Sequence, residues 1–372
     1  MCVCERQPQE ACFEMALTRE QVTAALRTVQ DPELFKDIVT LNMVKDVRVD
    51  GQNVDVTVEL TTPACPLKDV IERDVTAALK RIGAENVKLN LTANTRGAQG
   101  GQRKDDALPQ VKNIIAVGAG KGGVGKSTIA LNLAVGLQRC GAKVGLMDGD
   151  IFGPSMPTML GLKGKPPQVR GNKIQPFHVH GIHTITIGAL VEQDKPLIWR
   201  GPMATGAFKQ LLLDNTEWPE LDYLIVDLPP GTGDVPLTLC QLLPLTGAVI
   251  VATPQQVALD DAVRAVKMFQ QLGAPILGVV ENMSYFVSPS GEESDIFGRG
   301  GAQRAAQALG LPFLGELPMF TELRVNSDAG DPTANFTGNP KLREALEKIV
   351  THLAGEVSKH NLAAPTPTLN IT

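Results

Sequence analysis

The segment Gly118-Ala-Gly-Lys-Gly-Gly-Val-Gly-Lys-Ser-Thr128 decides how the larger part of this chain folds. It fills every fixed position of the phosphate-loop pattern G-x-x-x-x-G-K-[ST], with Gly120, Gly125, Lys126 and Ser127. The run before it, Val111–Val117, is short, apolar and β-branched, which predicts a buried strand. Apolar residues after it predict a helix over 127–139. The segment therefore joins a strand to a helix, which is the context that a phosphate-binding loop requires.

A loop of this composition can bind the phosphates of a nucleotide. Glycines allow backbone N–H groups to close around phosphate oxygens, and the helix N-terminus adds partial positive charge. We expect Lys126 to reach the β and γ phosphates of ATP and the Ser127 hydroxyl to ligate Mg²⁺. The candidate nucleotide-binding residues are Gly120, Lys121, Gly122, Gly123, Val124, Gly125, Lys126, Ser127 and Thr128. The complete pattern and both flanking elements disfavour the alternative, a glycine-rich turn without a ligand.

Aspartates follow two other predicted strands. The apolar run Tyr223–Val226 precedes Asp227, which is the Walker-B arrangement in which the carboxylate holds Mg²⁺ through water. Asp148-Gly-Asp150 follows the apolar run 143–147. In a parallel sheet, carboxylates at the carboxyl ends of strands face the ligand crevice. For Asp148 and Asp150 the alternative is a pair of loop carboxylates that only solvate the turn.

The spacing of apolar runs predicts an α/β fold for the larger part, with a doubly wound, mostly parallel sheet. A helix at 341–357 is expected to cover that sheet. The predicted strands lie at 111–117, 143–147, 182–187, 221–226, 248–252 and 276–280.

A smaller α+β domain precedes this part. A capping box at Thr18 predicts a first helix, and alternation predicts a hairpin of 44–49 and 54–60 joined by a four-residue loop. A helix at 67–82 and a strand at 86–91 complete it. The expected divisions are a polar leader at 1–15, the small domain at 16–95, a linker at 96–109, the ATPase domain at 110–358 and a disordered tail at 359–372.

Composition limits the classes of partner. The chain has 372 residues and a net charge of −5, so its overall charge indicates neither nucleic acid nor an anionic membrane as a partner. No apolar run reaches the roughly 18 residues of a membrane span, and no secretory signal is expected. The six cysteines are scattered, which fits reduced thiols. We therefore expect a cytoplasmic protein with no membrane or nucleic-acid partner.

Lys121 adds a second cation to the phosphate loop. The run Lys121-Gly-Gly-Val-Gly-Lys-Ser127 resembles the deviant loop of the MinD/ParA and nitrogenase-iron-protein branch. The resemblance implies that Lys121 reaches across a homodimer to the partner's nucleotide and supplies the charge that an arginine finger gives elsewhere. It also implies that the second aspartate, Asp150, orients the attacking water and senses the metal. A solvated surface lysine is the alternative for Lys121.

Further motifs resemble one family within this branch. They are Asp150-Ile-Phe-Gly-Pro-Ser155, Ile198-Trp-Arg-Gly-Pro-Met203, Asp227-Leu-Pro-Pro-Gly-Thr-Gly-Asp234, Pro244-Leu-Thr-Gly-Ala248, Thr253-Pro-Gln255, Glu281-Asn-Met-Ser-Tyr-Phe286 and Asp295-Ile-Phe-Gly298. With the small domain, they are similar to the Mrp (ApbC-type) iron–sulfur cluster carrier ATPases over about residues 16–340. The resemblance implies a homodimeric ATPase that carries a labile [4Fe–4S] cluster to apoproteins. It further implies that Asn282 contacts the nucleotide base.

The small domain resembles one that recurs in iron–sulfur assembly proteins, on Asp31-Pro-Glu33 and on Cys65 in Thr-Pro-Ala-Cys-Pro. A thiol at a turn before a helix has its thiolate stabilised, which favours a role for Cys65 as a reactive thiol or a cluster ligand. A small buried cysteine is the alternative.

The chain departs from the family at the cluster site. The family pattern places Cys-Pro-x-Cys after Tyr-Phe-Val, and its two cysteines from each subunit hold the bridging cluster. Here Ser288-Pro-Ser290 stands in that place, and a serine hydroxyl is a poor ligand for the iron of a cluster. We therefore expect the usual cluster site to be absent. Cys2, Cys4 and Cys12 lie in the polar leader, which either binds metal or is an extension before Met15.

Other patterns leave alternatives open. His178, His180 and His183 form an H-x-H-x-x-H run, but no acidic or cysteine partner is evident nearby, which argues against a metal site. The main alternative for the whole chain is a MinD/ParA-like scaffold, switched by nucleotide and holding no cluster. Loss of the cysteine pair favours it. A small-molecule kinase is a third hypothesis, and Lys121 argues against it.

Overall fold

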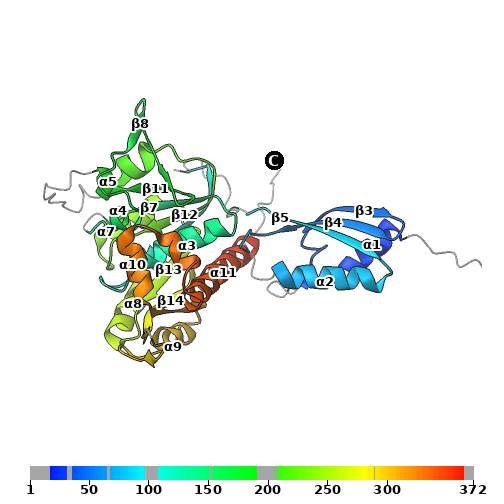
Figure 1. The fold of residues 1–372 in the computed structure, drawn as a ribbon. Helices are drawn as coiled ribbons and strands as arrows, with labels where there is room; N and C mark the ends of the chain where they lie inside the picture. The colour runs from blue at the N-terminus through cyan, green and yellow to red at the C-terminus, as the bar shows by residue number, and fades with distance from the viewer. Residues whose placement is uncertain are drawn as a thin grey trace, which may run out of the picture. The chain divides into compact units, whose positions relative to one another are not determined.

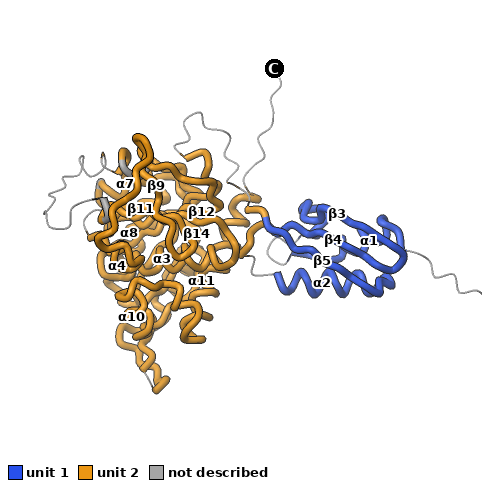
Figure 2. Tube along the Cα trace, turned by 45° about the horizontal axis from the view of Figure 1, so that its top comes forward, with its two compact units in different colours: residues 1–60, 67–93 blue, residues 61–66, 94–372 orange. Residues whose placement is uncertain are grey.

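The computed structural model describes residues 17–31, 36–64, 68–95, 97, 108–150, 153–190, 206, 208–288 and 290–363. The described residues form two compact units (Figure 2). The small unit takes residues from 1–60 and 67–93, and the large unit takes residues from 61–66 and 94–372.

The small unit is a three-stranded sheet in the order β3-β4-β5, with β3 antiparallel and β5 parallel to β4. Its helix α1 begins at the predicted capping box, in which Thr18 and Gln21 bond each other's backbone N–H. The β3–β4 connection has two residues, Gly51 and Gln52, instead of the expected four, because Asp50 pairs with Asn53. The elements are α1 (Arg19–Leu26), β1 (Gln30–Asp31), β2 (Lys36–Asp37), β3 (Val44–Asp50), β4 (Asn53–Leu60), α2 (Lys68–Arg81) and β5 (Asn86–Ala93).

The large unit is built on one nine-stranded sheet, in the order β10-β11-β7-β12-β6-β13-β14-β15, with β16 also paired to β14. Its strands are parallel except for β10 and β15. The strands of the unit are β6 (Val111–Gly118), β7 (Val144–Asp148), β8 (Gln168–Arg170), β9 (Lys173–Gln175), β10 (Phe177–Val179), β11 (Ile182–Thr186), β12 (Leu221–Asp227), β13 (Gly247–Ala252), β14 (Ile276–Val287), β15 (Glu293–Ser294) and β16 (Phe313–Met319).

Helices cover both faces of this sheet (Figure 1), which confirms the predicted doubly wound fold. One apolar core joins α3 and α11 to one face, and a second core joins α7, α8 and α9 to the other. The helices are α3 (Lys126–Arg139), α4 (Met156–Met159), α5 (Ile187–Leu190), the π-helix η1 (Lys209–Asp214), α7 (Asp234–Leu242), α8 (Gln256–Gln271), α9 (Gly301–Ala308), α10 (Thr321–Ala329), the 3-10 helix η2 (Pro332–Phe336) and α11 (Pro340–Ala363). Among the residues described, no helix is both long enough and apolar enough to span a bilayer.

The structure differs from the sequence-based expectation at several places in the large unit. Helix α11 continues to Ala363, past the expected end of the domain at 358, because Asn361 is still buried and bonds Asn113 at 2.9 Å. Strand β14 runs well beyond the expected 276–280. Strand β16 was not predicted, since Gly315 and Pro318 are residues that disfavour strands.

Residues 61–64, predicted as part of the small domain, pack with the large unit instead. Thr62 is buried, and its Oγ1 shares a hydrogen bond of 2.8 Å with the hydroxyl of Tyr223 on β12. Ala64 is buried in the core that joins α3 and α11 to the sheet. A buried side-chain bond and apolar contact therefore hold this segment to the ATPase fold.

Candidate functional site

The phosphate loop runs between β6 and α3, as predicted. Gly123 and Gly125 both have φ of +80°, a left-handed backbone that favours glycine. A Cβ on Gly120 would lie 2.1 Å from the carbonyl oxygen of Asp261, so this position also requires glycine. Gly125 caps α3 without a side-chain hydrogen bond. The first N–H groups of α3 are therefore not occupied by a capping side chain, as an anion site at a helix N-terminus needs.

Lys126 lies between two carboxylates. It is only 5% exposed, and its Nζ is 2.5 Å from Asp227 Oδ1 and 3.5 Å from Asp150 Oδ2. The Ser127 hydroxyl lies 3.4 Å from the same Nζ. Lys126 and Ser127 belong to the phosphate loop, whereas Asp227 ends the Walker-B strand and Asp150 lies in the loop after β7. The structure thus brings the predicted phosphate, metal and water residues together at the carboxyl ends of β6, β7 and β12.

Asp227 is fully buried at the end of β12. Burial raises the pKa of its carboxyl, and Lys126 acts in the opposite direction. Its Oδ2 is buried and accepts no hydrogen bond from any residue that the structure describes. A buried carboxylate oxygen without a donor is a position that calls for a ligand. Asp227 and the nearby Ser127 therefore fit the predicted Mg²⁺, which prefers oxygen ligands and keeps several waters.

Asp148 ends β7, where it pairs with Asp227 of β12, and Asp150 follows it by two residues. Asp148 is buried and accepts hydrogen bonds from Thr186 Oγ1 at 2.6 Å and from the Asp150 N–H at 3.1 Å. Burial first, and then the charge of Asp227, raise the pKa of Asp148 to about 7. Asp148 therefore fixes the turn that carries Asp150. The Asp150 carboxylate accepts from the Gly153 N–H at 3.3 Å and has its other oxygen near Lys126.

The loop after Asp227 is bonded to the end of β6 and to the start of the phosphate loop. The N–H of Leu228 donates to Val117 O at 3.1 Å, and the N–H of Gly231 donates to Ala119 O at 2.9 Å. Gly231 has a left-handed φ of +97°. One of these bonds thus ties the glycine-containing segment directly to the phosphate loop.

Lys121 differs from Lys126 in its surroundings. It is partly exposed and forms no ion pair with any described residue, whereas Lys126 is buried among carboxylates. Its neighbours Gly122 and Gly123 are exposed. Within the part of the chain that the structure describes, the Lys121 ammonium therefore has no carboxylate partner.

Asn282 lies on β14 and reaches the phosphate loop. It is buried, and its Nδ2 donates to the carbonyl of Val124 at 2.8 Å. Oδ1 has no described partner in this structure. The sequence indicated a contact between Asn282 and the base, but gave no sign of this bond to the loop, because the two residues are 158 positions apart. The contact with the base stays a prediction.

Most of the predicted thiols are not part of what the structure describes. Cys65 and the leader cysteines Cys2, Cys4 and Cys12 fall outside the described ranges. Of the two described cysteines, Cys140 is exposed after α3, and Cys240 is buried in α7. Burial raises the pKa of the Cys240 thiol to about 12, which makes it a poor nucleophile and ligand.

The serines at the usual cluster position form a tight turn between β14 and β15. The hydroxyls of Ser288 and Ser290 are 2.8 Å apart, and the N–H of Glu292 donates to Ser288 Oγ at 3.0 Å. Both hydroxyls are thus engaged in shaping the hairpin. Within the described ranges, no group of three or more His, Cys, Asp or Glu side chains could hold a metal ion.

The histidine run divides between two positions. His178 and His183 pair across β10 and β11, with their ring centroids 4.7 Å apart. His180 is in the turn between them, and its Nε2 lies 3.2 Å from the carbonyl of Leu160. Burial and His178 lower the pKa of His183. His178 and His183 therefore face each other across the strand pair, whereas the His180 ring is placed at Leu160.

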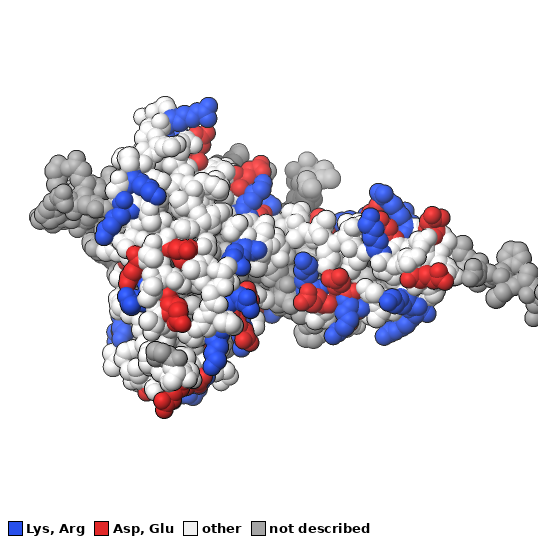
Figure 3. Space-filling view, in the orientation of Figure 1, with Lys and Arg blue, Asp and Glu red and all other residues white. Residues whose placement is uncertain are grey.

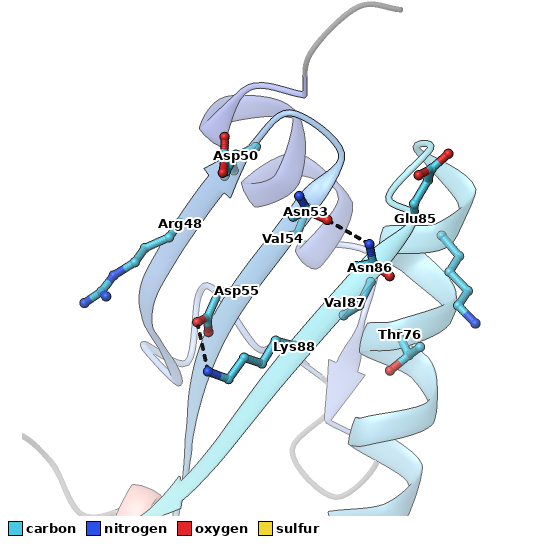
Figure 4. A pocket seen from close by; sticks show the side chains of 12 residues that line it. Arg48, Asp50, Asn53, Val54, Asp55, Thr76, Glu85, Asn86, Val87 and Lys88 are labelled. Carbon is cyan, nitrogen blue, oxygen red and sulfur yellow. Dashed lines mark hydrogen bonds and ion pairs between the residues drawn. The ribbon is translucent and has the colours of Figure 1, made fainter.

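Two surface features lie apart from these residues. Basic and acidic side chains are interspersed over the face in Figure 3, without a continuous basic area. The small unit has a hollow of about 600 Å³ beside β5 (Figure 4), where Asn86 donates to Asn53 at 2.8 Å and Lys88 lies 3.8 Å from Asp55. Two pairs of its polar groups thus bind each other, and no residue predicted as functional lines it.

Comparison with known proteins gives the same division of the chain. Residues 110–354 match the family model described as "ParA: NUBPL iron-transfer P-loop NTPase", and residues 19–89 match that of an iron-sulfur cluster assembly protein. The iron-sulfur cluster carrier protein of Synechocystis sp. is 48% identical over 349 residues, which cover 92% of this chain and 98% of the relative. That of Deinococcus radiodurans is 47% identical over 342 residues, which cover 91% and 95%.

Solved structures agree with the fold of the large unit. A nucleotide-binding protein from Archaeoglobus fulgidus, in complex with ADP, is 39% identical with a TM-score of 0.54, and the match covers 60% of this chain and 88% of that one. The cell division ATPase MinD of Pyrococcus furiosus is 22% identical with a TM-score of 0.50, covering 66% of this chain and 98% of that one. The second likeness concerns the fold alone.

Proposed function

Because this chain belongs to the iron-transfer P-loop NTPase family of iron–sulfur cluster carriers, we propose that it binds and hydrolyses ATP and delivers clusters to apoproteins. The observation that carries the nucleotide part is the position of Lys126, buried in a glycine cradle between Asp227 and Asp150. A cation and two carboxylates at a helix N-terminus suit a phosphate ester with its metal.

Each residue of the site has a proposed task in the reaction of ATP with water to give ADP and phosphate. The loop from Gly120 to Thr128 binds the phosphates, and Lys126 leaves its carboxylate partners to contact the β and γ oxygens. Asp150 orients the attacking water. Ser127 and, through water, Asp227 would hold Mg²⁺, which would supply positive charge beside the phosphate oxygens.

Asn282 and Lys121 extend the site. Asn282 uses one amide hydrogen to hold Val124, and its Oδ1 accepts no hydrogen bond from a described residue, which leaves it available to an amino group of the base. Lys121 forms no ion pair with the described residues of its own chain, which supports a task in a second subunit. We propose a homodimer in which each Lys121 contacts the nucleotide of the partner subunit.

The cargo is proposed to be a [4Fe–4S] cluster. Ser288 and Ser290 are excluded as its ligands, because hydroxyl oxygen suits such iron poorly and both hydroxyls are bonded within the turn. Cys65 is the thiol with motif support, and a leader cysteine is the candidate second thiol. The alternative function, a nucleotide-switched scaffold that holds no cluster, is favoured by the same two serines and differs in one measurable property, cluster binding.

The division of roles can be tested with three variants. Lys126→Ala should abolish ATP binding, because it removes the only buried cation that we place at the phosphates. Lys121→Ala and Asp150→Ala should retain much of the affinity and lose hydrolysis. ATP affinity is measured by calorimetry and turnover by phosphate release, with Lys348→Ala, an exposed lysine on α11, as the matched control. Equal loss of affinity in all three site variants would refute the assignment.

A further inference from the structure

Strand β14 connects the phosphate loop to an exposed segment, and this connection rests on the proposed nucleotide site. At one end of the contact, Asn282 Nδ2 donates to Val124 O at 2.8 Å. A Cβ on Gly125 would lie 2.1 Å from the same Nδ2 and 3.7 Å from Cε of Met283. Asn282 and Met283 therefore touch the phosphate loop at the turn that enters α3.

The backbone of Met283 is strained. Its φ is +56°, in the left-handed region, although it is neither a glycine nor in a turn but within β14. For a long side chain this conformation is costly, and it persists only where the surroundings impose it. The pairing of β14 with β16 shifts register between Asn282 and Phe286, so the ladder is interrupted around Met283. The bond from Asn282 to Val124 is one contact that holds the strained arrangement.

The next residue is also in an unfavourable state. Ser284 is buried, and its Oγ has no hydrogen-bond partner among the described residues. A buried hydroxyl without a partner costs free energy that another local arrangement can recover. The strained φ of Met283 and the unsatisfied hydroxyl of Ser284 are consistent with a segment that has two conformations, of which this structure shows one.

Glu281 and Tyr285, on either side of Asn282–Ser284, make contacts that hold the exposed loop 285–300. Both oxygens of the buried Glu281 accept backbone N–H groups at the start of α9, from Gly300 at 2.8 Å and Ala302 at 2.7 Å. Tyr285 has the Arg299 guanidinium 3.8 Å from its ring centroid. Arg299 also pairs with Glu293 and Glu316.

That loop carries an exposed apolar pair. Ile296 is 57% exposed and Phe297 is 37% exposed, and both lie between β15 and α9. They come directly after the hairpin of β14 and β15, whose turn contains Ser288. Any displacement of Glu281 or Tyr285 moves the anchors of this loop, so its position depends on the geometry of β14.

We propose that Asn282 and Met283 are positioning residues, and that Glu281–Ser284 acts as a hinge between the phosphate loop and the loop 285–300. Phosphate binding draws the backbone N–H groups of the phosphate loop toward the ligand and changes the bond between Val124 O and Asn282. Met283 then relaxes from its left-handed φ, and Glu281 and Tyr285 shift the loop that bears Ile296 and Phe297. The loop thereby reports whether nucleotide is bound.

Hydrogen exchange of the full chain, with and without Mg²⁺ and the slowly hydrolysed analogue ATPγS, tests the hinge. Peptides that span 285–300 should change their exchange rate by about tenfold on binding, as expected when a local opening is made easier or harder. Met283→Gly removes the strain and should lose this response, and its kcat should fall more than its KM changes. Met283→Leu keeps a side chain at the strained φ and should retain the response. Asn326→Ala, which removes an amide bond of 3.0 Å to Asn335 away from the loop, is the control for general destabilisation.

The outcomes separate the hinge from the proposed function. Calorimetry that shows no binding of ATPγS to the wild-type chain overturns the proposed function, and the hinge with it. Binding of ATPγS with unchanged exchange at 285–300 overturns the hinge alone. An equal response in Met283→Gly and the wild type overturns the role of Met283, and loss of the response in Met283→Leu as well shows that side-chain packing, not backbone strain, is responsible. If Met283→Gly does not fold, the wild-type measurement alone decides.

Discussion

Replacement of Lys126 by Met should make the fold depend on pH in a defined way. The side chain is 5% exposed, and its Nζ lies 2.5 Å from Asp227 Oδ1 and 3.5 Å from Asp150 Oδ2. Met keeps the apolar stem but removes the charge, so Asp227 stays buried without a counterion. Breaking a buried ion pair in this way costs about 3–5 kcal/mol.

The free-energy cost of the unpaired Asp227 carboxylate in Lys126→Met cannot exceed the cost of protonating it, because the neutral carboxyl group carries no buried charge. The Asp227 carboxyl has an ordinary pKa of 3.8, and one pH unit corresponds to about 1.4 kcal/mol, so protonation at pH 7 costs about 4 kcal/mol. At pH 5 the same step costs about 2 kcal/mol. In the variant the folded pKa is above the unfolded pKa, so stability is lost as pH rises from about 4. The destabilisation by Lys126→Met should therefore be about 4 kcal/mol at pH 7 and about half of that at pH 5.

Urea unfolding of the wild type and of Lys126→Met at pH 5, 6 and 7 measures this difference. The double variant Lys126→Met/Asp227→Asn removes both charges and should recover most of the lost stability, because breaking a pair costs more than replacing it. A destabilisation that is the same at all three pH values would refute the argument. So would a double variant whose loss equals the sum of the two single losses.

The remaining predictions concern single groups. Burial and the charge of Asp227 raise the pKa of Asp148 from 3.8 to about 7, so the folded state binds a proton that the unfolded state releases, and stability is lost as pH rises between about 4 and 7. Asp148→Asn removes this titrating group and should flatten the slope of stability against pH in urea unfolding. An unchanged slope would contradict the prediction. Tyr223→Phe removes the buried hydrogen bond to Thr62 and should lower the free energy of unfolding, measured by thermal unfolding, by about 1 kcal/mol. An unchanged stability would show that this bond does not contribute. Gly125→Ala should abolish ATP binding measured by calorimetry, while the circular dichroism spectrum stays native. Gly125 has a left-handed φ, and a Cβ there would lie 2.1 Å from the Asn282 amide nitrogen, so the position excludes a side chain. Retained ATP affinity in the variant would contradict this prediction.

The fold and the centre of the site follow from the sequence because their signals are local. A phosphate loop needs glycine at Gly125 and a helix directly after it, so a short pattern specifies the geometry. Asp148 and Asp227 end apolar strands, and parallel strands bring their carboxyl ends together, so their proximity also follows.

The parts that could not be predicted depend on long-range packing. Gly315 and Pro318 disfavour a strand by composition, yet Gly315 pairs with Val280 of β14, and β16 runs through both residues. The bond from Asn282 to Val124 and the left-handed φ of Met283 exist only because β14 passes beside the phosphate loop. No local pattern in the sequence contains that information.

The most direct test of the whole account is the iron and acid-labile sulfide content of the full chain after anaerobic purification and reconstitution with iron and sulfide. An ATP-dependent cluster carrier should bind both elements, show broad visible absorbance from charge transfer, and hydrolyse ATP in the same preparation. Cys65→Ser should lower the bound iron if the small domain supplies a ligand in place of Ser288. A chain that hydrolyses ATP but retains neither iron nor sulfide would contradict direct carriage and leave the nucleotide-switched scaffold as the function.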